Sequence, residues 1–143
     1  MILSIRVDER LLHGQILTKW VGYHQCQRVV VADESANADP FLKSLMRASL
    51  PQRVLLEVCG LERSLEFFSE ERPVRTLLLV RNAEALCRLV RMGAHVTQAN
   101  FALPPKEQEL PFVRELAARG VQMTIQMVPD SPPTLWHDII DER

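Results

Sequence analysis

A histidine lies within a run of charged residues close to the N-terminus of the chain. The run reads Arg6-Val7-Asp8-Glu9-Arg10-Leu11-Leu12-His13-Gly14-Gln15. Neutral imidazole is nucleophilic and titrates near physiological pH, so His13 could accept a phosphoryl group. Arg6 and Arg10 precede the histidine, and arginine donates planar, bidentate hydrogen bonds that match phosphate oxygens. This combination of residue types favours phosphoryl transfer.

The residues next to His13 could support such a reaction. Asp8 could hold an arginine in place or fix the tautomer of the imidazole, and Gly14 would let the backbone pass close by. A helix is expected to begin at Gly14, and its N-terminal amides would add a positive dipole end aimed at the same anion. The alternative is that His13 is only a helix cap or a surface residue, which is the commoner role of a lone histidine beside a glycine.

Motifs that bind nucleotides or mark common hydrolases are absent from the sequence. It contains no GxxxxGK[ST], no GxGxxG after a strand, no HExxH and no GxSxG. A histidine that accepts phosphate without a nucleotide site must receive it from another phosphoprotein. We therefore expect a protein partner and no cofactor.

Hydrophobic periodicity predicts strands and helices in alternation along the chain. Strands are expected at residues 2–7, 28–32, 54–58, 74–80, 96–101 and 121–128. Helices are expected at residues 14–23, 40–50, 61–68, 83–92, 110–119 and 134–140, the second capped by Asp39 with Pro40 at its first position. This alternation predicts an α/β fold, a single open, mostly parallel twisted sheet with helices on both faces. At 143 residues, the chain has room for one domain, residues 1–143.

In sheets of this kind, ligands and chemistry collect at the carboxyl ends of the strands. The loops expected there are residues 8–14, 33–38, 81–82 and 100–105. The first of these loops contains His13. The loop with the most reactive residue types is therefore expected at the carboxyl ends of the strands, where sites form in such sheets.

Composition and charge exclude several classes of function. Lys and Arg total 17 and Asp and Glu total 18, so the net charge of -1 predicts no binding to nucleic acid. The apolar runs are too short to cross a bilayer and the N-terminus has no signal peptide, so we expect a cytoplasmic protein. The three cysteines, Cys26, Cys59 and Cys87, are widely spaced without a CxxC pair, which predicts reduced, buried thiols and no metal site.

The run from Arg6 to Gln15, with Trp20 shortly after it, resembles the N-terminal signature of IIB components of the mannose/sorbose-type sugar phosphotransferase system. The similarity extends through nearly the whole chain. It continues in Val29-Val30-Val31-Ala32-Asp33-Glu34-Ser35-Ala36-Asn37 and in two C-terminal stretches, Arg119-Gly120-Val121 and Val128-Pro129.

The resemblance implies that His13 takes a phosphoryl group from the phosphohistidine of a IIA protein and passes it to a sugar. The sugar would arrive through the membrane components IIC and IID, so the protein would associate peripherally with that permease. The implied enzyme class is a protein-N-phosphohistidine:sugar phosphotransferase. Carried over by position, His13, Arg10 and Asp8 form the catalytic set, and Arg6, Gly14, Gln15 and Asn37 support the phosphate or the loop.

The chain departs from the family pattern after Asn100. Family members usually continue there with a glycine-rich turn and a longer hairpin-like insertion, whereas this chain has Phe101-Ala102-Leu103-Pro104-Pro105-Lys106. Two alternatives therefore stay open: a degenerate or regulatory IIB homologue that only binds proteins, and an unrelated ligand-binding protein in which His13 is structural. The sequence does not identify the sugar, and it leaves a homo-oligomer open. His24, His95 and His137 share no ligand spacing, which favours surface or cap roles for them.

Overall fold

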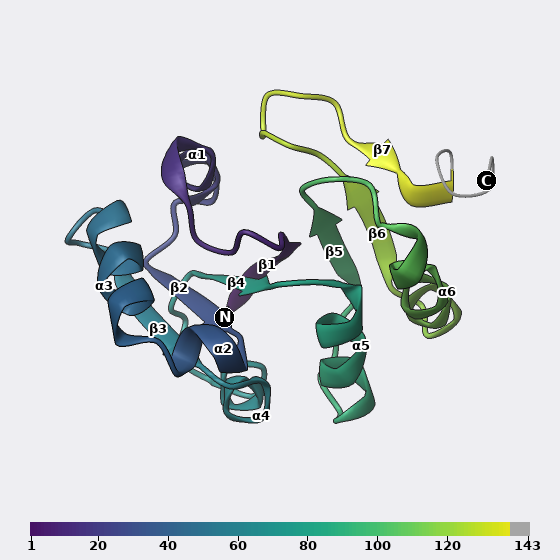
Figure 1. Ribbon diagram of the computed structural model, residues 1–143, viewed down its shortest axis with the longest axis horizontal. Coiled ribbons are helices and arrows are strands. Elements are labelled where there is room, and N and C mark those ends of the chain that lie inside the picture. Colours follow the sequence, from purple (N-terminus) through teal and green to yellow (C-terminus); the bar gives the residue numbers. More distant parts are fainter. Residues whose placement is uncertain (138–143) are drawn as a thin grey trace.

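The computed structural model describes residues 1–137, apart from the side chains of Gln15 and Ile16. Its centre is a seven-stranded sheet (Figure 1). The strands are β1 Ile2–Val7, β2 Arg28–Ala32, β3 Leu55–Cys59, β4 Thr76–Val80, β5 Gln98–Phe101, β6 Gln122–Ile125 and β7 Thr134–Leu135. Their order is β3-β2-β4-β1-β5-β6-β7, and every neighbouring pair is parallel except β6 and β7. The predicted α/β fold with a mostly parallel open sheet is confirmed.

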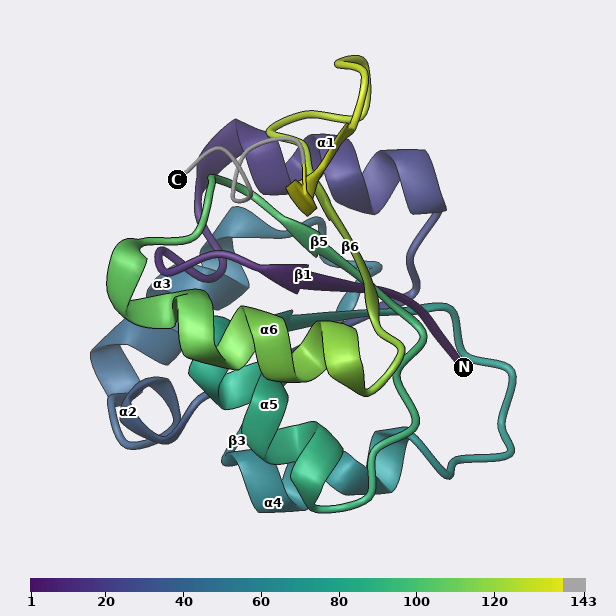
Figure 2. The same ribbon diagram turned by 90° about the vertical axis from the view of Figure 1, so that its right-hand side faces the viewer.

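Helices cover both faces of this sheet, as predicted. The described helices are α1 Gly14–His24, α2 Glu34–Asn37, α3 Pro40–Ser49, α4 Leu61–Ser64, α5 Ala83–Arg91 and α6 Leu110–Ala118, with short 3₁₀ helices at Leu65–Phe67 and Glu107–Glu109. Helices α1, α2 and α3 supply buried residues to one hydrophobic cluster, and α4, α5 and α6 to another. Figure 2 shows α5 and α6 side by side on one face and α1 on the other. Within the described part of the chain, no helix is long and apolar enough to span a membrane.

Local sequence explains why the central strands and the first long crossover form where they do. Every residue of β2 and β4 is buried, as expected of apolar runs in a parallel sheet with both faces covered. The Asp39 carboxylate accepts a hydrogen bond of 3.1 Å from the Leu42 amide, and Pro40 follows the cap. The predicted start of this helix is therefore confirmed.

Parallel pairing brings the ends of four strands to one edge of the sheet. Val7 of β1 lies opposite both Val80 of β4 and Phe101 of β5, and β2 adjoins β4 on its other side. Beyond the strands, the Asp8 amide still donates a hydrogen bond of 3.0 Å to the Val80 carbonyl. The loops that follow β1, β2, β4 and β5 therefore begin side by side, as expected for residues 8–14, 33–38, 81–82 and 100–105.

The structure corrects three of the predicted elements. Thr134–Leu135, predicted as the start of a helix reaching Ile140, forms β7. Trp136 and His137 are helical as predicted, and residues 138–140 lie outside the described residues. Two prolines just before this segment restrict its backbone, and the edge of β6 offers a hydrogen-bonding ladder. The strand predicted to reach Val128 ends at Ile125 because the next carbonyls accept hydrogen bonds from Arg6 instead. The loop predicted after β2 contains α2, which Asp33 caps.

The three cysteines are free thiols and all are buried. Burial raises the pKa of Cys26, Cys59 and Cys87 to about 11 in each case. The thiols are therefore protonated at neutral pH and poor nucleophiles, which leaves His13 as the candidate for covalent chemistry.

A buried ion pair fastens the segment before β4 at the amino ends of the strands, far from the His13 edge. Arg28 is 3% exposed, and its Nη2 donates to Glu70 Oε2 at 2.5 Å while its Nε donates to Thr76 at 3.0 Å. The guanidinium also lies 4.6 Å from the centre of the Phe67 ring. The hydrogen bond from Arg28 is the main reason that the pKa of Glu70 falls from 4.5 to about 2.

We expect Glu70→Gln to reduce the free energy of unfolding at neutral pH by about 2–3 kcal/mol, since it leaves a buried arginine without its counter-ion. A lowered folded-state pKa stabilises the protein above the unfolded value and loses that contribution as the pH falls. The wild type should therefore lose this contribution between pH 4.5 and about 2, and Glu70→Gln should lose less over that window. Urea unfolding at several pH values measures both effects. The exposed neighbour Glu71, changed to Gln, is the control, and equal stability of Glu70→Gln and wild type at neutral pH would contradict the expectation.

Candidate active site

The loop of residues 8–13, here called the His13 loop, turns sharply between β1 and α1. The Leu11 amide donates to the Asp8 carbonyl at 2.8 Å, and Leu11 adopts a positive φ of 55°. Its side chain is only 2% exposed, so burial compensates for an unfavourable backbone conformation. Gly14 also has a positive φ, of 44°, but no atom lies within 4 Å of the place where a Cβ would stand. Gly14 thus has a backbone angle that favours glycine, and the close approach expected from the sequence stays a prediction.

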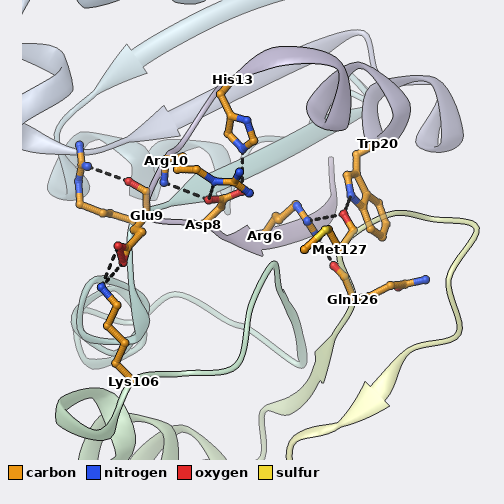
Figure 3. Close-up of polar contacts among 10 residues, drawn as sticks. Arg6, Asp8, Glu9, Arg10, His13, Trp20, Lys106, Gln126 and Met127 are labelled. Carbon is orange, nitrogen blue, oxygen red and sulfur yellow. Dashed lines mark hydrogen bonds and ion pairs between the residues drawn. The ribbon is translucent and has the colours of Figure 1, made fainter.

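Asp8 holds both His13 and Arg10 (Figure 3). Its Oδ2 lies 3.0 Å from His13 Nε2, and its Oδ1 accepts a hydrogen bond of 3.0 Å from the Arg10 amide. The Arg10 guanidinium makes longer contacts with the same carboxylate, from Nε at 3.3 Å and from Nη2 at 3.5 Å. The structure therefore brings together the three residues that the sequence assigned to catalysis.

The protonation of Asp8 determines the tautomer of His13. Burial raises the pKa of the Asp8 carboxyl, but the hydrogen bonds from His13 and Arg10 together outweigh burial and leave the pKa below its ordinary value of 3.8. Asp8 is ionised at neutral pH and can only accept hydrogen bonds, so His13 Nε2 carries the hydrogen. The lone pair of the neutral ring is then on Nδ1, which has no hydrogen-bond partner among the described residues.

His13 occupies the N-cap position of α1, yet its side chain makes no capping hydrogen bond. The imidazole is directed to Asp8 instead, and it remains 25% exposed. The first turn of α1 has no acidic side chain, so its free amides and positive dipole end are not neutralised locally. The capping role that the sequence left open for His13 is therefore not what its ring does.

Arg6 is buried at 2% exposure and is directed away from His13 (Figure 3). Its Nη1 donates to the Asn100 side chain and, at 3.0 Å, to the Gln126 carbonyl, while Nη2 donates to the Met127 carbonyl at 2.9 Å. The guanidinium lies 4.5 Å from the centre of the Trp20 ring, whose Nε1 donates to the same Met127 carbonyl at 3.0 Å. Burial lowers the pKa of Arg6 to about 10, so it stays charged. Of the two roles the sequence allowed, phosphate anchor or loop anchor, this geometry favours the second.

The two remaining sequence candidates make no described contact with the His13 loop. Gln15 is the second residue of α1, and its side chain lies outside the described part of the structure. Asn37 ends α2 with its side chain exposed, and within residues 1–137 it makes no side-chain hydrogen bond. Roles for Gln15 and Asn37 stay predictions.

Sequence reasoning did not assign a role to two cations that contact Glu9. Arg81 donates from Nη1 to the Glu9 carbonyl at 2.9 Å, and Lys106 lies 2.7 Å from the Glu9 carboxylate. The sequence did indicate where Arg81 lies. It directly follows the buried strand β4, in a loop expected at the carboxyl ends of the strands. Lys106 lies in the segment that departs from the family pattern, so this short segment contacts the His13 loop.

His13 lines neither of the two hollows described here. One hollow of about 760 Å³ lies against β1, β5 and β6 and is lined by polar residues such as Gln98 and Gln122. Another of about 180 Å³ adjoins Asp8, Arg10 and Arg81. In residues 1–137, no group of three or more His, Cys, Asp or Glu side chains is placed to hold a metal ion. His13 is 25% exposed, so its ring is accessible to a reacting group that another protein presents.

The family of the chain follows from comparison with known proteins. The family model described as PTS system sorbose subfamily IIB component matches residues 2–143. The chain belongs to this family. The resemblance inferred from the residues around His13 is thus confirmed, and the reading as an unrelated ligand-binding protein is wrong.

Over the aligned residues, curated relatives are about a quarter identical to this IIB component. The mannose-specific EIIAB component of Escherichia coli K12 is 26% identical over 153 residues, which cover 96% of the chain and 47% of that protein. The chain thus spans about half the length of the EIIAB relatives it matches. The sorbose-specific EIIB component of Klebsiella pneumoniae is 24% identical over 96% of the chain and 93% of its own length. The fructose-specific EIIB component of Bacillus subtilis is 24% identical over 90% and 88%.

Solved structures show the same fold. The IIBSor domain of the sorbose permease from Klebsiella pneumoniae superposes with a TM-score of 0.90 at 23% identity, covering 99% of the chain and 97% of that domain. A N-acetyl-galactosamine IIB component from Streptococcus pyogenes gives a TM-score of 0.87 at 23% identity, covering 96% of each chain. The fold of this IIB component is therefore that of its family, whereas the roles of individual site residues rest on the geometry described above.

Proposed function

We propose that this IIB component is a phosphocarrier that accepts a phosphoryl group on His13 from a phosphorylated IIA protein. It then passes the group to a sugar that enters through membrane IIC and IID components, as a protein-N-phosphohistidine:sugar phosphotransferase. The observation that carries this proposal is the contact of 3.0 Å between His13 Nε2 and the ionised Asp8, which leaves Nδ1 as the nucleophile. The protein would act in the cytoplasm, at the inner face of the permease.

In the first step, the Nδ1 lone pair of His13 attacks the phosphorus of the donor phosphohistidine. A new N–P bond forms on His13 as the donor N–P bond breaks, and the bonding pair returns to the donor ring. Positive charge develops on the His13 ring during this step. Asp8 accepts the Nε2 hydrogen bond and stabilises that charge, just as a carboxylate stabilises an imidazolium in other nucleophilic sites.

In the second step, a sugar hydroxyl attacks the phosphorus and displaces His13. An O–P bond forms, the His13 N–P bond breaks with its electron pair returning to Nδ1, and the hydroxyl proton passes to water. In both steps a phosphoryl group leaves a histidine nitrogen and bonds to an acceptor atom. The atoms and electrons of both steps balance without an oxidant, a metal or a nucleotide.

Two features of the site could hold the phosphoryl oxygens. The first turn of α1 presents amides beside His13 with no acidic side chain in that turn. Arg10 is 46% exposed, and its side-chain contacts with Asp8 are long, so the guanidinium can turn towards a phosphoryl group at little cost. Arg6 has its guanidinium committed to backbone and amide groups and is assigned to loop anchoring.

Phosphorylation by a IIA protein tests the proposal. The full chain is incubated with the phosphorylated IIA protein of a mannose/sorbose-type system, and its intact mass and ³¹P spectrum are recorded. We expect the addition of one phosphoryl group per chain, with the chemical shift of Nδ1-phosphohistidine. No addition, or a label on another residue, would overturn it.

The degenerate or regulatory alternative is tested in the same preparation. The short segment after Asn100, where the resemblance implies a longer insertion in family members, contacts the His13 loop through Lys106. Adding membranes that contain the IIC and IID components, with candidate sugars, should then release the phosphoryl group as a sugar phosphate. A chain that accepts the group but transfers it to none of them would support the regulatory reading.

A further inference from the structure

Arg81 lies at the meeting point of three strand ends. It directly follows β4, and β4 lies between β2, which leads into Asp33, and β1, which leads into the His13 loop. A long side chain at this position can reach both neighbouring loops.

The Arg81 side chain contacts both loops at once. Nε and Nη2 donate to the two oxygens of Asp33 at 3.1 and 2.9 Å, which is a bidentate pair. Nη1 donates to the Glu9 carbonyl at 2.9 Å. Asp33 is held in turn, because its Oδ2 also accepts the Ala36 amide at the start of α2.

The Glu9 carbonyl and the Arg10 amide belong to one peptide group, and that amide donates to Asp8. Glu9 stands between Asp8, which orients the imidazole, and Arg10, whose amide binds Asp8. Rotation of the peptide groups at Glu9 would move both neighbours. The loop also contains Leu11 with a positive φ, so its conformation depends on contacts from outside the loop.

We propose that Arg81 is a positioning residue for phosphoryl transfer at His13. Asp33 fixes the Arg81 guanidinium, which in turn binds the Glu9 carbonyl, so that Asp8 keeps its contact with the imidazole. This inference rests on the proposed function. It assigns a role to the loop after β2 that requires no contact between that loop and the phosphoryl group. This role needs two donors for the Asp33 carboxylate and a third for the Glu9 carbonyl, in a fixed planar arrangement that lysine cannot provide.

Lys106 gives a matched comparison because it contacts the same residue in a different way. Its ammonium pairs with the Glu9 carboxylate, and both side chains are more than half exposed, at 56% and 54%. Such a surface pair contributes little and leaves the backbone of Glu9 unconstrained. Removing Lys106 therefore deletes a cation near Glu9 without releasing the carbonyl.

The test uses phosphoramidate, a small phosphoryl donor that does not depend on protein docking, with the full chain and its variants. We expect Arg81→Gln to slow phosphorylation of His13 about tenfold at saturating phosphoramidate, because the imidazole is less well oriented. Arg81→Lys should fall between Arg81→Gln and wild type, and Lys106→Gln should stay within twofold of wild type. Asp33→Asn should reproduce part of the effect, and combining it with Arg81→Gln should add little, since both break the same link.

A spectroscopic readout separates positioning from general destabilisation. In wild type and Lys106→Gln, the ¹⁵N signals of the His13 ring should show a hydrogen-bonded Nε2–H, and in Arg81→Gln the two ring tautomers should mix while thermal unfolding remains cooperative. Should Arg81→Gln unfold, Arg81→Lys and Asp33→Asn carry the comparison. Wild-type rates and ring signals in the folded Arg81 and Asp33 variants would overturn the inference. A wild-type chain that takes no phosphoryl group from either phosphoramidate or the IIA protein would overturn the proposed function instead.

Discussion

Replacement of His13 by alanine should abolish phosphorylation by the IIA protein while leaving the fold intact. Intact-mass measurement should detect no added phosphoryl group, because the proposed acceptor nitrogen is lost with the imidazole. The His13 ring is partly exposed and makes no capping hydrogen bond, so its removal should cost only about 1 kcal/mol of stability, from the lost contact with Asp8. Thermal unfolding of the variant measures that cost.

Two controls make this prediction specific. His95→Ala changes an exposed histidine that lines the larger hollow, and it should be phosphorylated at the wild-type rate. The wild-type label should be lost in acid and survive base, as a phosphoramidate does, whereas a carboxyl phosphate on Asp8 or Asp33 would also be lost in base. A phosphoryl group on His13→Ala, or a label that survives acid, would refute the mechanism even though the family is established.

Replacement of Arg10 by alanine should slow phosphoryl transfer by roughly 30- to 1000-fold, equivalent to about 2–4 kcal/mol of lost transition-state stabilisation. The guanidinium is 46% exposed beside His13, and only its longer contacts with Asp8 have to break for it to meet the phosphoryl oxygens. Arg10→Lys should recover only part of the rate, since a point charge replaces a bidentate fork. Single-turnover kinetics with the phosphorylated IIA protein measures these rates.

Arg53→Ala is the control for net charge. Arg53 is exposed in the turn before β3, and its replacement removes one positive charge without touching the His13 loop. It should transfer within twofold of wild type at all salt concentrations. Equal slowing of Arg53→Ala and Arg10→Ala would show that only overall electrostatic attraction of the donor is affected, and a wild-type rate in Arg10→Ala would remove Arg10 from the site.

Features that depend on residues close together in the chain could be predicted from the sequence. The apolar runs at residues 29–32 of β2 and 77–80 of β4 indicate buried parallel strands, because strands covered on both faces read as near-continuous apolar runs. Asp39 followed by Pro40 marks a helix start because the cap acts over three residues. The same locality applies to the site, where Asp8, Arg10 and His13 lie within one loop and meet through contacts of at most five residues in sequence.

Only the tertiary structure shows which charged side chains lie beside His13 and which bind backbone groups in other parts of the fold. Arg6 binds carbonyls 120 and 121 residues away, and Arg81 binds a carbonyl 72 residues away. Every residue has a backbone carbonyl, so the acceptors leave no pattern in the sequence, and only the packing of β1, β4 and β6 determines which of them an arginine can reach. For the same reason β7 could not be foreseen, because two residues pair with β6 only where the folded sheet leaves an open edge.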